Sequence, residues 1–120
     1  VFAGIESRGF ILACMLAQKY NKGMVLVRKA GKLPGNTVKV SYTIEYGKAQ
    51  MEMQKTALEK NERVLICDDL LATGGTAKAA AKLIEKLGAE ITGFAFIIEL
   101  TALKGIEKIK EYRTESLVEY

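Results

Sequence analysis

Short apolar runs alternate with polar, glycine-containing stretches along this chain, and the first of these runs define its N-terminal elements. The apolar run from Val1 to Ile5 predicts a strand, and the polar cluster from Glu6 to Gly9 predicts a tight loop at its end. The segment from Phe10 to Tyr20 predicts a helix. The unbroken apolar run from Met24 to Val27 is typical of a strand that is buried on both faces of a sheet.

The middle of the chain combines a loop with a predicted hairpin. The segment from Ala30 to Asn36 contains two glycines and the only proline, which predicts a loop. Apolar and polar residues alternate from Val38 to Tyr46 and from Met51 to Gln54, on either side of Gly47. This period of two predicts a two-stranded hairpin with one solvent-exposed face, and we expect the hairpin to project from the body.

The C-terminal half repeats the alternation of strand and helix. The apolar segment from Arg63 to Cys67 predicts a buried strand, and Asp68 to Gly75 predicts a loop. Apolar residues at helical spacing from Thr76 onward predict a helix that Gly88 ends. The remaining predicted elements are a strand from Ile91 to Ile98, a short helix from Lys104 to Lys110 and an edge strand from Ser116 to Val118.

This alternation predicts an α/β fold, in which helices flank a mostly parallel sheet and the hairpin projects from it. In such folds ligands bind outside the carboxyl ends of the strands. The length of 120 residues fits a single core domain over residues 1–120. The chain has no initiator Met and opens within an apolar run, so we expect native sequence upstream of Val1 to be missing.

Composition narrows the possible chemistry. The chain has no histidine, which excludes Ser-His-Asp triads, Cys-His pairs and the usual zinc sites. Cys14 and Cys67 form no C-x-x-C pair, so we expect free buried thiols and a cytoplasmic location. The net charge of +4 favours anionic ligands, but the lysines are dispersed among glutamates, and we expect no nucleic-acid partner. The longest apolar run, Phe10 to Ala17, falls short of the ~18 residues that a membrane span needs, so we expect no membrane partner.

The segment from Val64 to Thr76 carries the most informative pattern. An apolar strand delivers two adjacent carboxylates, Asp68 and Asp69, and a Thr-Gly-Gly-Thr turn then opens a helix. Because Gly74 and Gly75 have no side chains, backbone N–H groups at the helix N-terminus can approach an anion closely. The pattern predicts a monophosphate cradle beside carboxylates that bind sugar hydroxyls or a hydrated Mg²⁺.

A simpler interpretation of the same residues is a helix cap followed by a solvated acidic loop. The two features occur together and in register, which favours the phosphate site. The nucleotide motifs G-x-x-x-x-G-K-[ST] and G-x-G-x-x-G are absent from the sequence, so neither an NTPase nor a dinucleotide enzyme is supported.

The chain resembles the type I phosphoribosyltransferases, which bind 5-phosphoribosyl-1-pyrophosphate (PRPP) with an apolar strand, two acidic residues and a Thr-Gly-Gly-Thr-like loop. The resemblance runs nearly end to end, and it points to the members that act on adenine. It implies the type I phosphoribosyltransferase fold, with the hairpin as a lid. The further motifs that carry it are Gly4 to Phe10, Arg28-Lys29 with Gly31 to Gly35, Tyr42 with Glu45 to Gly47, and Ser116 to Tyr120.

This resemblance implies that separate segments of the chain bind the different parts of PRPP. Asp68 and Asp69 would hold the ribose hydroxyls, and Ser7 and Arg8 would hold the pyrophosphate. On local sequence alone, Arg8 is better explained as a surface charge at a helix start, and the resemblance to the family reverses that preference. The 5-phosphate site that the resemblance implies comprises Ala72, Thr73, Gly74, Gly75 and Thr76.

The loop after the second strand is the further pyrophosphate candidate. Lys29 and Lys32 lie where a pyrophosphate or a neighbouring subunit is expected, and a solvated basic face is the alternative. The resemblance also implies a cis peptide bond between Glu6 and Ser7.

The hairpin carries the implied catalytic residue. Glu45 matches the glutamate that exchanges a proton with N7 of adenine, and its alternative is an exposed hairpin charge. Tyr46 would close over PRPP as part of a lid, and Leu70 would line the base pocket.

The implied reaction transfers the phosphoribosyl group of PRPP to adenine, which gives AMP and pyrophosphate in purine salvage. Mg²⁺ would be bound mainly through PRPP, and a homodimer is expected. The segment that recognises adenine in these enzymes would lie upstream of Val1. Two alternatives stay open: a phosphoribosyltransferase for another purine base, and a regulatory module that only binds PRPP. The chain could also be an inactive fragment of an enzyme.

Overall fold

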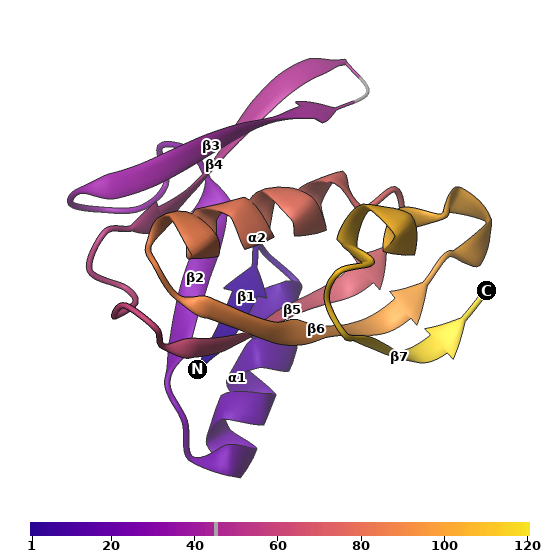
Figure 1. Cartoon of the computed structure of the whole chain (residues 1–120), viewed down its shortest axis with the longest axis horizontal. Helices are drawn as coiled ribbons and strands as arrows, with labels where there is room; N and C mark the ends of the chain where they lie inside the picture. Colours follow the sequence, from indigo (N-terminus) through magenta and orange to yellow (C-terminus); the bar gives the residue numbers. More distant parts are fainter. Residues whose placement is uncertain (45) are drawn as a thin grey trace.

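The computed structural model of this chain describes residues 1–44 and 46–120. These residues form a seven-stranded sheet in the order β3-β4-β2-β1-β5-β6-β7 (Figure 1). The neighbouring strands β2, β1, β5, β6 and β7 are all parallel to one another. Strand β4 pairs antiparallel with both β2 and β3. The bounds are β1 Phe2–Ile5, β2 Met24–Lys29, β3 Thr37–Ile44, β4 Gly47–Gln54, β5 Arg63–Leu71, β6 Glu90–Glu99 and β7 Thr114–Glu119.

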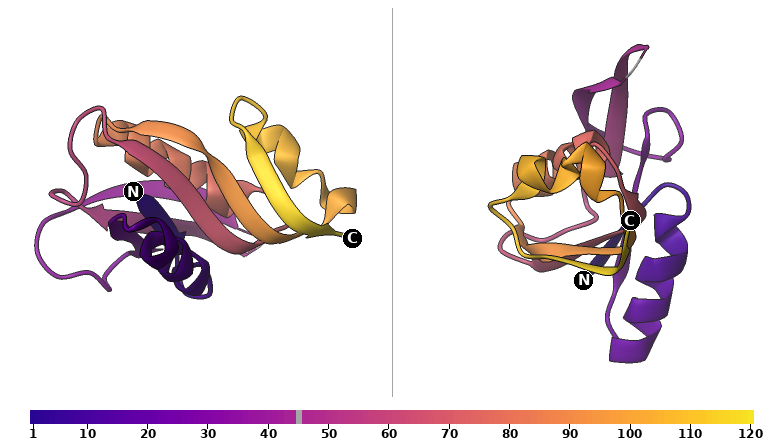
Figure 2. Two further views of the ribbon diagram at one scale, coloured as in Figure 1. Left: turned by 90° about the horizontal axis from the view of Figure 1, so that it is seen from below. Right: turned by 90° about the vertical axis from the view of Figure 1, so that its right-hand side faces the viewer.

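Two helices cover opposite faces of the sheet, α1 (Gly9–Tyr20) on one and α2 (Gly75–Lys86) on the other (Figure 2). The α1 helix packs on β1 and β5 through small residues. A Cβ added to Gly4 would lie 3.0 Å from the Cβ of Ala13, so glycine allows the helix to approach the strand closely. The predicted mostly parallel α/β fold is therefore confirmed.

The α2 helix packs its alanine-rich side against the sheet. Ala80, Leu83 and Ile84 are fully buried, as the helical spacing of apolar residues predicts. Gly88 follows the helix with a φ of +83°, the left-handed conformation in which glycine commonly ends a helix. Two short 3₁₀ helices, η1 (Thr101–Leu103) and η2 (Gly105–Ile109), then lead from β6 to β7, and η2 falls within the short helix that the sequence predicts.

The predicted loop from Asp68 to Gly75 is wrong in its first half. Asp68, Leu70 and Leu71 continue β5, because they pair in parallel register with residues of β6. Only the short connection before α2 is a loop. Both aspartates therefore sit on a strand whose backbone is held by a neighbouring strand, and this makes their positions firmer than a loop would.

Burial differs from expectation in two further strands. Met24 to Val27 is not buried on both faces, since Leu26 is 37% exposed; α1 packs mainly over β1 and β5 and leaves part of β2 uncovered. The hairpin does not have one uniformly exposed face either. Met51, Glu52 and Met53 are all buried where β4 passes between β2 and β3.

The expectation of two buried thiols holds for one cysteine only. Cys67 lies in the buried interior of β5, and burial raises the pKa of its thiol to about 12. Cys14 is exposed, because it lies on the side of α1 that faces away from the sheet. Both are free. No helix in the described part of the chain is long and apolar enough to cross a membrane.

Candidate active site

A cavity of about 550 Å³ opens at the carboxyl ends of β1 and β5, beside the N-terminus of α2. The parallel strands bring together residues that are far apart in the sequence, as the α/β topology predicts. Most of the predicted site residues line this one cavity. They are Ser7, Arg8, Lys29, Asp68, Asp69, Leu70 and the run from Ala72 to Thr76.

The loop that enters α2 has the geometry of an anion cradle. Gly74 adopts a φ of +88°, a conformation that residues with side chains rarely adopt, and α2 begins directly after it. No side chain caps this end of the helix, so its first N–H groups face the cavity without an internal partner. The helix dipole adds a partial positive charge at the same point. This loop can bind a phosphate.

Gly105, at the start of η2, supports the cradle from behind. A Cβ added to Gly105 would lie 2.2 Å from the carbonyl oxygen of Ala72 and 2.9 Å from the backbone nitrogen of Gly74. Conversely, a Cβ on Gly74 would lie 2.5 Å from the carbonyl oxygen of Gly105. The loop and η2 are thus in backbone-to-backbone contact. Sequence reasoning missed Gly105, because nothing local to it signals a contact with a segment about thirty residues away.

The two aspartates differ in environment. Asp68 is mostly buried, and burial is the main reason that its pKa rises to about 7 from the ordinary value of 3.8; the neighbouring Asp69 raises it further. The backbone N–H of Asp69 donates to Oδ1 of Asp68 at 2.8 Å, and Gly9 packs against the same carboxyl group. Asp68 can therefore both accept and donate a hydrogen bond near neutral pH, which suits contact with a sugar hydroxyl.

The loop after β1 lies beside these aspartates, because β1 and β5 are neighbouring parallel strands. The Nε of Arg8 lies 2.8 Å from Oδ2 of Asp69, and the Arg8 side chain is otherwise largely exposed. Ser7 is exposed beside it, and the Glu6–Ser7 peptide bond is cis, as the resemblance implies. A guanidinium and a hydroxyl at the cavity mouth are suited to bind an anion such as pyrophosphate.

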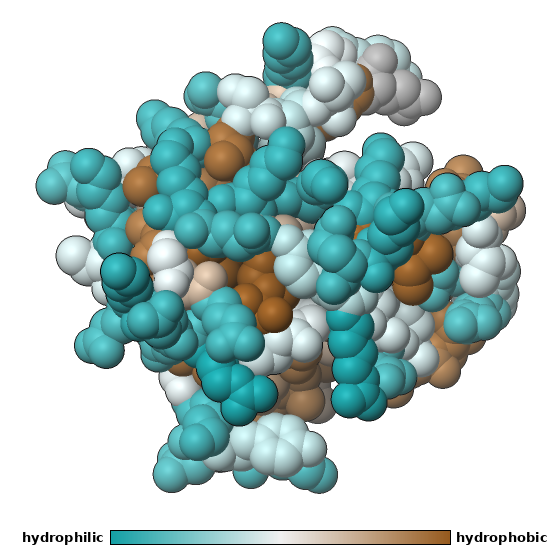
Figure 3. Space-filling view, in the orientation of Figure 1, coloured by the Kyte–Doolittle hydropathy of each residue, from teal (hydrophilic) through white to brown (hydrophobic). Residues whose placement is uncertain are grey.

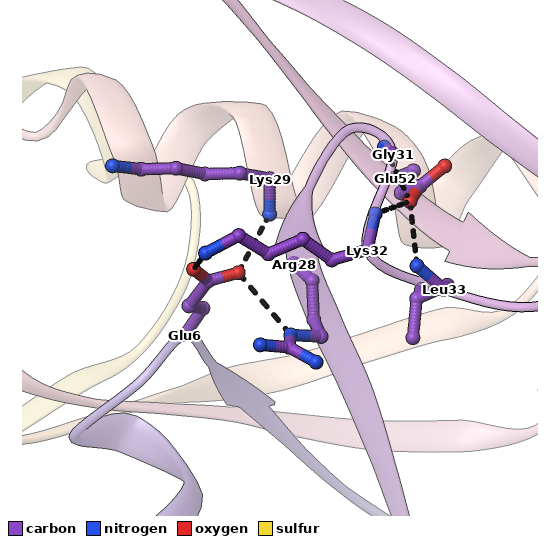
Figure 4. A network of polar contacts seen from close by, with 7 residues as sticks. All are labelled: Glu6, Arg28, Lys29, Gly31, Lys32, Leu33 and Glu52. Atoms are coloured by element: carbon purple, nitrogen blue, oxygen red, sulfur yellow. Dashed lines mark hydrogen bonds and ion pairs between the residues drawn. The ribbon is translucent and has the colours of Figure 1, made fainter.

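Glu6, which sequence reasoning did not single out, is the centre of a polar network behind this loop (Figure 4). Its carboxylate accepts the backbone N–H of Lys29 at 2.9 Å and the Nε of Arg28 at 3.3 Å, and it forms an ion pair with Lys32. Burial raises the pKa of Glu6, but these three partners outweigh it and hold the pKa below its ordinary value. Lys32 is thus engaged by Glu6, and it does not line the cavity.

The hairpin runs along α2, from Lys39, whose carbonyl oxygen accepts from Lys86 at the C-terminal end of the helix, to Thr43 near its N-terminal end. A Cβ added to Gly75 would lie 3.8 Å from the carbonyl oxygen of Thr43, so the hairpin runs close beside the cradle. Figure 3 shows a gap between the outer part of the hairpin and the body below it. Tyr46 is 91% exposed and does not line the cavity, so its predicted closure over PRPP requires the hairpin to move. Glu45 lies outside the described residues.

Comparison with known proteins identifies the class to which this architecture belongs. Residues 1–118 match the phosphoribosyl transferase domain family. Since that match extends over almost all of the chain, the chain belongs to the phosphoribosyltransferase family. The α/β topology and the position of the cavity agree with this membership.

Individual relatives place the chain among the adenine phosphoribosyltransferases of that family. The enzyme of this name from Nitrosopumilus maritimus is 71% identical over 120 residues, which cover 100% of this chain and 71% of the relative. The crystal structure of adenine phosphoribosyltransferase from Rhodothermus marinus superposes with a TM-score of 0.96 at 48% identity, covering 99% of this chain and 68% of that one. The enzyme from Trypanosoma brucei, solved in complex with AMP, pyrophosphate and ribose-5-phosphate, gives a TM-score of 0.89 at 35% identity, covering 98% of this chain and 55% of that one.

Proposed function

We propose that this chain forms the PRPP-binding core of an enzyme that transfers the phosphoribosyl group of PRPP to adenine, which yields AMP and pyrophosphate. The observation that carries the proposal is the single cavity in which the end of β5, the N-terminus of α2 and the loop after β1 meet. The ligands of the Trypanosoma brucei relative support it, because AMP and pyrophosphate are the products of this reaction.

Each part of PRPP has a chemically matched segment. The N–H groups from Ala72 to Thr76 suit the 5-phosphate, and the adjacent carboxylates of Asp68 and Asp69 suit the ribose hydroxyls. Arg8, in the loop after β1, and Lys29, at the end of β2, supply positive charge where the leaving pyrophosphate would lie. The protein's contribution is then mainly to position PRPP and to stabilise the charge that develops as the bond between ribose and pyrophosphate breaks.

Mg²⁺ fits this site as an ion held mainly by the substrate. Within residues 1–44 and 46–120, no cluster of three or more carboxylate or thiol side chains forms a metal cage. Mg²⁺ commonly binds one or two carboxylates together with substrate phosphates and water, and Asp68 and Asp69 match that requirement. When bound, the ion would offset the negative charge of the pyrophosphate group. The expected homodimer, the cytoplasmic location and the absence of a nucleic-acid partner stay predictions.

Glu45 is our candidate for the group that exchanges a proton with N7 of adenine. We expect Glu45→Gln to lower kcat by about a hundredfold, since an amide cannot transfer this proton, while the affinity for PRPP changes little. Steady-state kinetics with a separate titration of PRPP binding measure both quantities. Unchanged turnover in the variant would remove Glu45 from the mechanism.

The proposed activity is tested by pyrophosphate release from PRPP and Mg²⁺, with adenine, hypoxanthine, guanine and orotate supplied in turn. We expect the full-length protein to release pyrophosphate with adenine alone. This 120-residue chain is assayed beside it, with the full-length protein as the reference. Release with another base instead would change the substrate. Tight PRPP binding without release in the presence of any base would replace the enzyme by a regulatory PRPP sensor.

A further inference from the structure

Glu52 is a buried carboxylate that binds the loop between β2 and β3. Glu52 lies in β4 and is only 2% exposed. Its Oε2 accepts N–H bonds from three consecutive residues, at 2.9 Å from Gly31 and 3.0 Å from both Lys32 and Leu33 (Figure 4). Burial raises the pKa of Glu52, but these bonds and one from the Thr37 hydroxyl outweigh it, so the carboxylate is ionised.

The loop that Glu52 binds carries a side chain back toward the cavity. Lys32 forms an ion pair with Glu6, and Glu6 also accepts a bond from the backbone N–H of Lys29. Glu6 directly precedes Ser7 and itself lines the cavity. A continuous chain of contacts therefore runs from β4, through the loop and Lys32, to the segment at which the pyrophosphate group would bind.

We propose that Glu52 is a positioning residue for the pyrophosphate half of the site, and that it acts through Lys32 and Glu6 on Ser7 and Arg8. This inference rests on the proposed function, which makes those two residues pyrophosphate ligands. The physical reason is the number of charge-assisted bonds that one buried group supplies. Three N–H groups converge on a single oxygen atom, and such bonds are roughly twice as strong as neutral ones.

The location of Glu52 also ties this half of the site to the hairpin. The same strand that carries Glu52 forms one arm of the hairpin and pairs along its whole length with β3. On β3, Tyr42 is half-buried, and burial together with the negative charge of Glu6 raises the pKa of its phenol. Beside Glu52, β4 pairs with Arg28 and Lys29 of β2, the two residues that donate to Glu6, so the base of the hairpin and the pyrophosphate loop share one network.

The substitution Glu52→Gln tests the proposal, because it keeps the volume of the side chain and removes its charge. In the natural full-length protein we expect the KM for PRPP and the Kd for inorganic pyrophosphate to rise about tenfold, from weakened charge-assisted bonds. The phosphate cradle is a separate segment, so the Kd for ribose 5-phosphate and kcat should stay within about twofold. A merely structural defect would weaken both ligands alike, and that result would overturn the proposal.

Two further variants make the test specific. Glu62→Gln is the matched control, since the Glu62 carboxylate also accepts a backbone N–H, that of Glu59 at 3.0 Å, in a loop outside the cavity; it should change neither ligand. Lys32→Met should reproduce the Glu52→Gln effect, and the double variant should be no worse than either single one. The proposal would be overturned if the losses of pyrophosphate affinity in the two single variants added up in the double variant. It would also be overturned if Glu52→Gln kept full affinity for pyrophosphate. Failure of the wild-type protein to bind PRPP at all would overturn the proposed function with it.

Discussion

Gly105→Ala is expected to weaken PRPP binding about a thousandfold, although Gly105 lies outside the segments that we propose bind the substrate. The added Cβ would fall 2.2 Å from the carbonyl oxygen of Ala72 and 2.9 Å from the nitrogen of Gly74, and both are backbone atoms that cannot rotate away. The cradle must move, and its N–H groups then no longer converge on the 5-phosphate. Losing two such bonds to a charged ligand weakens binding by about a thousandfold.

Isothermal titration with PRPP and with ribose 5-phosphate measures this effect, and both affinities should fall together because both ligands carry the 5-phosphate. Gly23→Ala is the matched control, since a Cβ at Gly23 would meet nothing within 4 Å. Overpacking of this kind typically costs about 1–3 kcal/mol of stability, so thermal melting must show that Gly105→Ala still folds. Wild-type affinity in a folded Gly105→Ala protein would show that the cradle does not depend on η2.

Asp68→Asn is expected to make the protein more stable and less active at once. The unfolded chain releases the Asp68 proton near pH 3.8, whereas the folded chain retains it up to a pH of about 7, chiefly because the group is buried. Between pH 3.8 and about pH 7 the folded state binds more protons than the unfolded state. The stability that Asp68 contributes is therefore fully present below pH 3.8 and is lost as the pH rises to about 7. Asparagine has no proton to lose, and its Oδ1 can still accept the N–H of Asp69.

Urea denaturation of both proteins at about pH 4, 6 and 8 measures this contribution, because groups far from Asp68 titrate alike in the two proteins. At pH 8 the variant should be more stable by about 2–4 kcal/mol, and the difference should shrink toward zero near pH 4. Its affinity for PRPP should fall, since a neutral amide binds ribose hydroxyls less well than a carboxylate. Equal stability of the two proteins at pH 8 would show that Asp68 ionises normally.

The sequence predicts the cavity well where neighbouring residues carry the pattern. An apolar strand, two aspartates and a Thr-Gly-Gly-Thr turn occupy one continuous segment, and the α/β alternation then places that segment at the carboxyl end of the sheet. The one error there is the length of β5, since the acidic pair interrupts the apolar run although β6 still pairs with it. Backbone pairing with a neighbouring strand overrides the local polarity of these residues.

Residues whose role depends on distant partners were not predictable in the same way. Glu52 follows the alternation that predicts an exposed position, yet it is buried because three N–H groups from another loop satisfy its charge. Glu6 and Gly105 likewise acquire their roles from segments more than twenty residues away. Periodicity describes which face of an element is apolar, and it does not record where unpaired backbone groups from elsewhere will converge.

The ion pair between Arg8 and Asp69 has a consequence for how the site discriminates between PRPP and its hydrolysis products. It joins the proposed pyrophosphate segment to the proposed ribose segment and engages Oδ2 of Asp69, so a sugar hydroxyl gains access to that oxygen only when Arg8 turns away. PRPP offers Arg8 a new anionic partner when that happens, whereas ribose 5-phosphate offers none. Because an exposed pair of this kind is worth at most about 1 kcal/mol, we expect a preference for the intact substrate of about fivefold. The ion pair thus favours the ligand that carries both halves.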